Sequence, residues 1–317
     1  MKKHTMSFVL IMAGVLSAGA LQAQAADKDG LKIVTTIFPE YDWVMNLLGE
    51  NPAGASVTML LDSGIDLHSY QPTVEDIMEI SNCDLLIYVG GESEAWVKDA
   101  LQEAVNPDMA VISLLEALGD KAKEEEIVEG MEGEAEEDPE LDEHVWLSLR
   151  NASFLCESIE KTLETLDTDN AELYQSNLTV YTEKLAALDQ KYETVVAEGS
   201  RDTLLFGDRF PFRYLTDDYG LSYYAAFVGC SAETEASFET IAFLAQKVDE
   251  LSLKTVMTLE GSDRRIAETI VESTKNKDQQ ILSLDSLQSI TAKDVEEGAS
   301  YLAVMESNLE ILKEALE

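Results

Sequence analysis

The alternation of short apolar runs with helical stretches constrains the fold of this chain most. Buried strands are predicted in the first half at 31–37, 56–61, 84–90 and 109–114, and in the second half at 203–207, 222–227, 253–259 and 280–284. Helical patterns occupy 40–49, 73–81, 92–104, 237–250, 263–275 and 293–316. Because strands that alternate with helices form parallel sheets covered by helices on their faces, the sequence predicts an α/β fold.

A stretch without strand patterns, 152–198, separates the two halves. It contains no proline or glycine, and residues 171–198 have the pattern of one long helix. We therefore predict two α/β lobes, each with a mainly parallel four-stranded sheet, joined by a long connecting helix; a single continuous sheet is the alternative. Ligands of open α/β sheets bind beyond the carboxyl ends of the strands, which favours a site in the cleft between the lobes.

The predicted domain boundaries follow from this pattern. Residues 1–25 form a signal peptide, because Lys2 and Lys3 precede an apolar run that ends near Ala23-Gln24-Ala25. The N-terminal lobe spans 26–165, the connecting helix 166–199 and the C-terminal lobe 200–317. The apolar run is shorter than the ~20 residues of a membrane span, which disfavours an uncleaved anchor. We expect an exported protein, periplasmic or extracytoplasmic, without lipid attachment, since no cysteine follows the run.

The charge of the chain limits its partners. A formal net charge of −40 argues against binding to nucleic acid or to an anionic membrane surface. Most residues in the block 123–143 are acidic, and we expect this block to be a mobile, solvated loop. The alternative is that it collects cations weakly near a binding site.

Cysteine and histidine are both rare, with 3 residues each. Cys83 and Cys156 lie in apolar patterns and are predicted to be small core residues, whereas Cys230 follows a strand and is expected to be more exposed. An odd number of cysteines in an exported protein leaves at least one outside a disulfide within the chain.

Two of the histidines lie in predicted loops of the mature chain, whereas His4 lies in the signal peptide. His68 follows the strand 56–61 and precedes a helix that begins near Thr73, and His144 follows the acidic block. A lone histidine is more often structural than functional. Histidine is also the commonest metal-ligating side chain, and two in corresponding loops, with no others present, favour a metal site.

Three segments together resemble a known family. They are DSGIDLHSYQPTVEDI (62–77), DLLIYVGGESEAW (84–96) and DEHVWLSLRNA (142–152). They are similar to the zinc- and manganese-binding solute-binding proteins of ABC importers, whose patterns include G-x-D-x-H-x-Y-x-P-T and D-x-H-V-W-L-x-x-x-N. The resemblance extends over essentially the whole mature chain. It implies two lobes joined by a long helix, with a metal ion in the interlobe cleft.

The resemblance also implies four protein ligands to the metal. His68 and His144 match the first two, and Asp285 in QILSLDSLQSI matches the fourth, although a turn or cap role for this acid is the alternative. The third ligand departs from the family, because Arg209 stands where a histidine or glutamate is usual. Asp208 becomes the third ligand if the loop is shifted by one residue. The alternatives are Glu260, Glu233, Glu235 or a water molecule.

The expected function is capture of one divalent metal ion, Zn²⁺ or Mn²⁺, by a monomer that delivers it to an ABC permease. Two imidazoles and two carboxylates suit either ion, so the donor types leave the metal open. An enzyme is not expected, since H-E-x-x-H, G-x-S-x-G and P-loop motifs are absent from the sequence. An adhesin or cation buffer on the same fold is the alternative, and a metallohydrolase is the least favoured.

Overall fold

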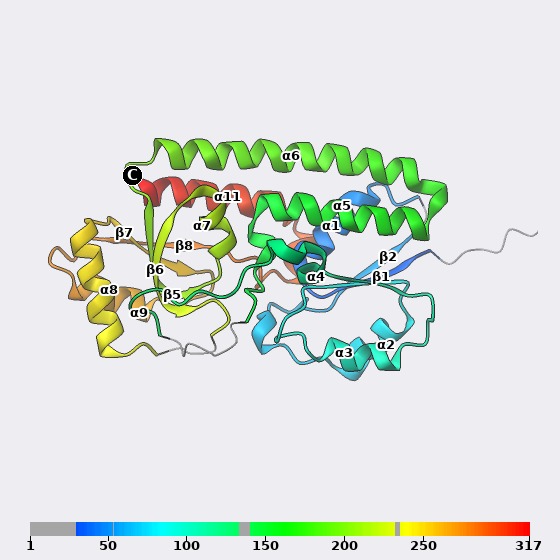
Figure 1. Ribbon diagram of the computed structural model, residues 1–317, viewed down its shortest axis with the longest axis horizontal. Coiled ribbons are helices and arrows are strands. Elements are labelled where there is room, and N and C mark those ends of the chain that lie inside the picture. Colours follow the sequence, from blue (N-terminus) through cyan, green and yellow to red (C-terminus); the bar gives the residue numbers. More distant parts are fainter. Residues whose placement is uncertain (1–29, 53, 133–139, 232–234) are drawn as a thin grey trace, which may run out of the picture.

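The computed structural model describes residues 30–52, 54–132, 140–231 and 235–317. The predicted signal peptide, residues 133–139 of the acidic block and Glu233 therefore lie outside the described residues. The chain forms two lobes side by side, each built on a parallel four-stranded sheet (Figure 1). The eight strands lie at the predicted positions, and two separate sheets replace the alternative of a continuous one.

The N-terminal sheet has the strand order β2-β1-β3-β4. Its strands are β1 (Lys32–Thr35), β2 (Ser56–Met59), β3 (Leu85–Tyr88) and β4 (Ala110–Ser113). The helices of this lobe are α1 (Phe38–Leu48), α2 (Val74–Asn82), α3 (Val97–Ala100) and α4 (Leu114–Leu118). The central strand β3 is buried along Leu85–Ile87, as expected for a strand covered on both faces.

The C-terminal sheet has the corresponding order β6-β5-β7-β8. Its strands are β5 (Thr203–Phe210), β6 (Ser222–Val228), β7 (Thr255–Leu259) and β8 (Gln280–Leu284). Its helices are α7 (Arg213–Tyr219), α8 (Phe238–Leu251), α9 (Arg265–Ser273) and α10 (Ala292–Glu296). The register of β5 against β6 shifts between Phe206 and Arg209, so a bulge lies at Gly207 and Asp208. Bulges redirect the side chains that follow them.

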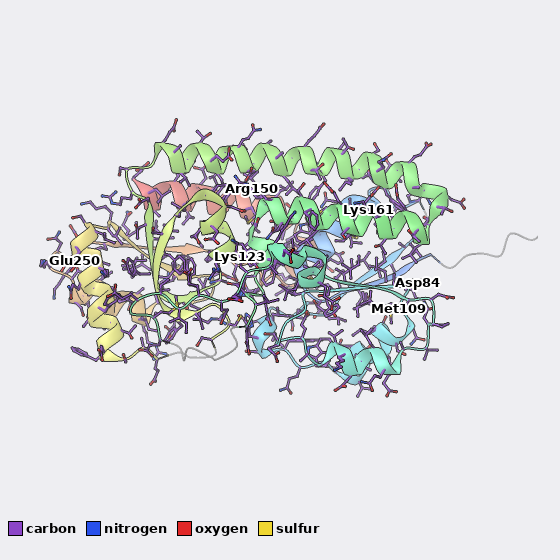
Figure 2. The ribbon with its side chains drawn as sticks, viewed as in Figure 1. Asp84, Met109, Lys123, Arg150, Lys161 and Glu250 are labelled. Atoms are coloured by element: carbon purple, nitrogen blue, oxygen red, sulfur yellow. The ribbon has the colours of Figure 1, made fainter. Side chains whose placement is uncertain are left out.

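A layer of long helices covers both lobes. It consists of α5 (Leu149–Leu166), α6 (Ala171–Glu198) and α11 (Tyr301–Leu316), and α6 runs from one lobe to the other (Figure 1). Arg150 at the start of α5 pairs with carboxylates of α6, at 3.1 Å from Asp189 and 2.7 Å from Glu193 (Figure 2).

Buried hydroxyl groups connect this layer to the lobes. The Tyr181 hydroxyl of α6 donates to the Asp42 carboxylate of α1 at 3.2 Å. The Tyr301 hydroxyl of α11 donates to the carbonyl of Trp146 at 2.7 Å. Beside these hydrogen bonds, an apolar core continues through both lobes. A smaller core packs α8 and α9 against the C-terminal sheet.

Two helix predictions were wrong in extent. The stretch 92–104 contains only the short helix α3 followed by a 3₁₀ turn, and before α3 the Glu94 carboxylate accepts from the Gly90 N–H at 2.8 Å. The stretch 293–316 is two helices, α10 and α11. Gly298, with φ of +98°, ends the first, and the Ser300 side chain caps the second by accepting from the Ala303 N–H.

Where the structure describes it, the acidic block is partly exposed, as predicted, and partly ordered against the C-terminal lobe. Residues 123–132, which we term the acidic strap, cross from the N-terminal lobe to the edge strand β6. The Glu132 N–H donates to the Ala226 carbonyl at 2.8 Å, and the Lys123 N–H donates to the Tyr214 hydroxyl at 2.9 Å, at the junction of the lobes (Figure 2). An edge strand offers unpaired backbone groups, and Glu132 of the strap uses one of them, while Glu124, Glu126 and Glu129 remain exposed.

Ion pairs hold the strap in place as well. Glu126 lies 3.3 Å from Arg213, and Glu129 lies 3.8 Å from Lys247.

None of the helices within the described ranges combines the length and the apolar composition that a bilayer span requires.

Candidate metal centre

His68 lies in the loop that leaves the carboxyl end of β2. A single 3₁₀ turn, Leu67–Ser69, holds it, and the Asp66 carboxylate caps this turn by accepting from the His68 N–H at 2.9 Å. The imidazole is only 6% exposed. The capped turn directs the side chain inward, toward the C-terminal lobe.

His144 lies in a second turn built in the same way. The Asp142 carboxylate accepts from the His144 N–H at 2.9 Å, and a 3₁₀ turn, Val145–Leu147, leads into α5. His144 is fully buried. Both histidines thus follow an aspartate by two residues, and in both cases that aspartate caps the backbone of the histidine.

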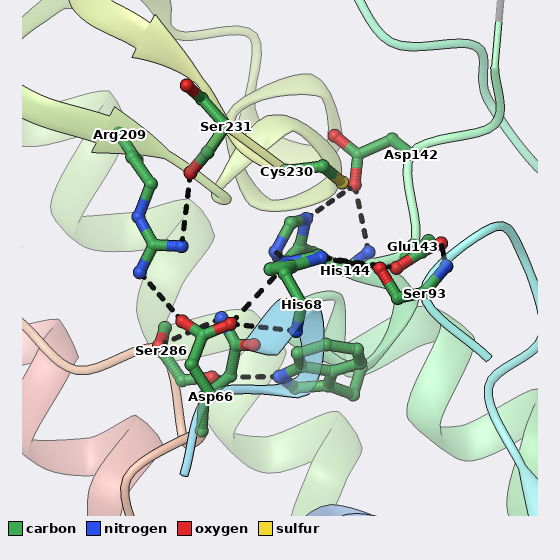
Figure 3. Close-up of polar contacts among 12 residues, drawn as sticks. Asp66, His68, Ser93, Asp142, Glu143, His144, Arg209, Cys230, Ser231 and Ser286 are labelled. Atoms are coloured by element: carbon green, nitrogen blue, oxygen red, sulfur yellow. Dashed lines mark hydrogen bonds and ion pairs between the residues drawn. The ribbon is translucent and has the colours of Figure 1, made fainter. Parts of the chain in front are cut away.

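The two imidazoles face each other. Figure 3 shows the two rings side by side, and their Nε2 atoms are 3.1 Å apart. The Nδ1 atom of His144 lies 3.0 Å from the Asp142 carboxylate, and the Nδ1 atom of His68 lies 2.7 Å from the Ser93 hydroxyl and 3.4 Å from Glu143 Oε2. Oxygen partners at both Nδ1 atoms orient the rings and place the proton of a neutral imidazole on Nδ1. Both Nε2 atoms then present lone pairs to the same point, which is an arrangement that a cation stabilises.

Glu143 contacts both His68 and Ser93. Its Oε1 accepts from the Ser93 N–H at 2.9 Å, and its Oε2 is buried without a hydrogen-bond partner among the described residues. Burial raises the pKa of the Glu143 carboxyl, but its contacts with His68 and Ser93 outweigh burial and lower the pKa. The carboxylate therefore remains charged beside His68.

Cys230 lies close to both histidines. Within the described ranges, the group of three potential metal-ligating side chains is formed by His68, His144 and Cys230, whose ligand atoms all lie within 4.8 Å of one another. Cys230 follows the carboxyl end of β6 and is partly buried. Burial, together with Glu125, Glu143 and Asp142, raises the pKa of its thiol, so the metal-free protein carries a neutral thiol here.

A salt bridge between the lobes closes one side of the cluster. The Arg209 guanidinium of the C-terminal lobe lies 2.7 Å from the Asp66 carboxylate of the N-terminal lobe (Figure 3). Burial raises the pKa of Asp66, but Arg209 and His68 outweigh it, so the pKa lies below its usual value. An interlobe cavity of about 420 Å³ lies beside this bridge and is lined by both residues.

Of the predicted acidic ligands, the structure places Asp208 outside the donor group. Its two carboxylate oxygens accept from the backbone N–H groups of Arg209 at 2.9 Å and Leu259 at 3.3 Å. It lines the interlobe cavity from the bulge in β5.

Asp285 and Glu260 lie together after β8 and β7, and neither joins the donor group. Asp285 accepts from the Leu287 N–H at 2.7 Å, and Glu260 accepts from the Ser286 N–H at 2.8 Å and from its hydroxyl. Burial and the neighbouring Asp285 raise the pKa of Glu260 to about 7. Glu235 is exposed near the start of α8.

Sequence reasoning missed several residues of this centre. Asp142, Ser93 and Glu143 hold the imidazoles, and Cys230 was assigned no role. The repeated Asp-x-His spacing and the position of Cys230 at the end of a strand were the available signals. The other two cysteines, Cys83 and Cys156, lie fully buried in the core as predicted.

Comparison with known proteins supplies the context of this geometry. Residues 33–315 match the family model described as zinc-uptake complex component A, periplasmic. The zinc-binding lipoprotein AdcA of Streptococcus pneumoniae serotype 4 is 30% identical to this chain. The match covers 99% of this chain but only 61% of the length of that relative. The high-affinity zinc uptake system protein ZnuA of Bacillus subtilis is 28% identical, covering 99% of this chain and 98% of that protein.

Solved structures share the fold as well. The crystal structure of the Zn(II)-bound ZnuA-like domain of Streptococcus pneumoniae AdcA matches with a TM-score of 0.72 and 28% identity. The match covers 90% of this chain and 99% of that domain.

Proposed function

Because the chain belongs to the periplasmic zinc-uptake component A family, we propose that it is an exported solute-binding protein for a divalent metal ion. It captures one ion as a monomer and delivers it to an ABC permease for uptake. Zinc is the favoured cargo and manganese the alternative. The observation that carries the proposal is the pair of Nε2 atoms, 3.1 Å apart, on turns from distant parts of the chain.

The spacing of these atoms suits direct coordination. Zinc–nitrogen bonds of ~2.0–2.1 Å to two atoms at this separation subtend about 100° at the metal, close to the tetrahedral angle. Both rings are held through Nδ1 by an oxygen partner, as metal-ligating histidines usually are. The separation thus needs little adjustment on metal binding.

The acidic ligands that the resemblance implies stay predictions. The Asp208 carboxylate accepts from two backbone N–H groups and Asp285 accepts from one, and a ligating carboxylate can keep such hydrogen bonds. Glu260, which holds Ser286, is the alternative. A role in catalysis is not proposed, because the expected site is a closed one that binds the ion by protein side chains, whereas catalytic zinc sites retain an open position.

The proposal is tested by metal content and competitive zinc affinity of residues 26–317. We expect one tightly bound ion in the wild type. Both His68→Ala and His144→Ala should weaken zinc binding at least about 100-fold, since loss of a direct ligand should exceed the 10–100-fold effect of losing an outer partner.

Gln71→Ala is the matched control, because this exposed side chain lies on the same loop as His68. It should leave the affinity unchanged. Several weakly bound ions in the wild type would instead favour the cation buffer. Unchanged affinity in both histidine variants would refute the proposed site.

A further inference from the structure

The sulfur atom of Cys230 meets the two histidines at the point where a metal ion would lie. We propose that Cys230 is the third protein ligand, giving a two-histidine, one-thiolate site that takes zinc in preference to manganese. The inference rests on the proposed function and specifies the donor set and cargo of that same site. The observation that supports it is that the Sγ atom of Cys230 and one imidazole nitrogen atom of each histidine all lie within 4.8 Å of one another.

The backbone around Cys230 is built for this approach. Gly229 precedes it, and a Cβ at that position would lie 2.9 Å from Cε1 of His144 and 3.0 Å from the carbonyl oxygen of Phe210. Such distances are too short for any other residue, so glycine is what lets the strand end reach His144. The Cys230 N–H then donates to Glu125 of the acidic strap at 3.1 Å, which fixes the residue from the other side.

Arg209, at the position where the resemblance implies the third ligand, cannot supply a donor. Arg209 has a guanidinium, which remains positively charged and has no lone pair to offer a metal. This guanidinium pairs with Asp66, and it lies 3.5 Å from the carbonyl of Ser231, the residue after Cys230. Arg209 thereby holds the cysteine-bearing loop against the N-terminal lobe, which makes it a positioning residue.

The other cysteines of the chain provide the contrast. Cys83 and Cys156 are both fully buried in the apolar core. Cys83 lies beside Met109, with the two sulfur atoms 3.4 Å apart, and Cys156 lies on α5. Small buried cysteines behave as apolar side chains. Cys230 instead lies among histidines and carboxylates, at the carboxyl end of a strand where α/β proteins bind ligands.

A thiolate ligand has a definite chemical consequence. On binding, the thiol proton passes to the solvent, and a sulfur lone pair forms a metal–sulfur bond of ~2.3 Å in the case of zinc. Sulfur is a soft donor that suits zinc, whereas manganese suits oxygen donors. The set of two imidazoles and a thiolate therefore discriminates between the two ions in a way that a carboxylate in the same place would not.

Cobalt absorption tests the ligand directly, with Co²⁺ as the probe in the zinc site. Residues 26–317 loaded with Co²⁺ should show a sulfur-to-cobalt charge-transfer band in the near ultraviolet. Cys230→Ser should lose this band and bind zinc at least about 100-fold more weakly, with a smaller loss for manganese, by the ligand argument used above. Cys83→Ser and Cys156→Ser are the controls that should keep the band.

The outcomes separate the inference from the proposed function. Tight Co²⁺ binding without the band, or a band that persists in Cys230→Ser, would overturn the thiolate ligand but leave the metal-binding function in place. A greater loss of zinc affinity in Asp208→Asn than in Cys230→Ser would assign the third position to the carboxylate. No tight metal in the wild type would overturn both. Thermal unfolding of each metal-free variant verifies that it is folded.

Discussion

At the scale of single residues, the centre depends on the aspartates that precede the histidines. Asp142 both caps the backbone N–H of His144 and holds its Nδ1 atom, at 2.9 Å and 3.0 Å. A carboxylate on Nδ1 fixes the tautomer and the ring orientation and makes Nε2 a better donor. We therefore expect the aspartate to contribute to metal affinity without being a ligand itself.

Asp142→Asn is expected to weaken zinc binding by roughly 10–100-fold, the usual cost of losing an outer-shell partner. The amide keeps the shape of the carboxylate but removes its charge beside Nδ1. Competitive titration with a zinc chelator measures the change. Asp120→Asn, at an exposed position of the same lobe, is the control. Equal affinities in wild type and Asp142→Asn would contradict a supporting role for the carboxylate.

At the scale of elements, contacts between helices set the pH dependence of folding. Asp42 on α1 is 8% exposed and accepts a hydrogen bond from Tyr181 on α6. Burial raises the pKa of Asp42 to about 6. In the unfolded chain the pKa of an aspartate is about 3.9, so between these values the folded protein binds more protons than the unfolded one.

The ionisation of Asp42 should therefore decrease the free energy of unfolding by up to about 3 kcal/mol as the pH rises from 4 to 7. Asp42→Asn removes the ionisation. The wild type should lose stability over this pH range through Asp42, whereas the variant should not. The difference between them, variant minus wild type, should therefore increase with pH. Urea unfolding of both metal-free proteins at each end of the range measures the difference. A difference that stays constant or decreases with pH would show that Asp42 is not the responsible group.

Elements also explain which local predictions failed. The strands were predictable because continuous apolar runs of five to seven residues are short-range patterns. The helix expected at 92–104 formed only in part, as α3 and the 3₁₀ turn that follows it. The acidic strap was predicted to be solvated from its composition, yet the edge of β6 offers it backbone partners that composition does not reveal.

At the scale of the whole molecule, the metal position is shared between the lobes. His68 comes from the N-terminal lobe, Cys230 from the C-terminal lobe and His144 from the segment that returns from the acidic strap. The salt bridge between Arg209 and Asp66 spans the same interface. An ion bound here should therefore stabilise the folded arrangement of both lobes.

Zinc at 100 times its Kd should increase the free energy of unfolding by about 2.7 kcal/mol, provided that the unfolded chain does not bind it. For a chain of this size that corresponds to a rise in Tm of roughly 4 °C. Differential scanning calorimetry with and without zinc measures it, with magnesium as the control ion. His68→Ala should lose the rise. An equal rise in wild type and variant would mean that zinc stabilises the protein from elsewhere.

The sequence by itself determined the two parallel sheets, the long helix between them and the pair of histidines in loops. These follow from local patterns, because apolar periodicity and turn residues act over a few positions. The tertiary structure decided what surrounds the histidines. The bulge in β5, the course of the acidic strap and the meeting of Cys230 with His68 and His144 all depend on how distant segments pack. Spacing along the chain carries no information about such contacts, so the position of Cys230 beside the two histidines became visible only in three dimensions.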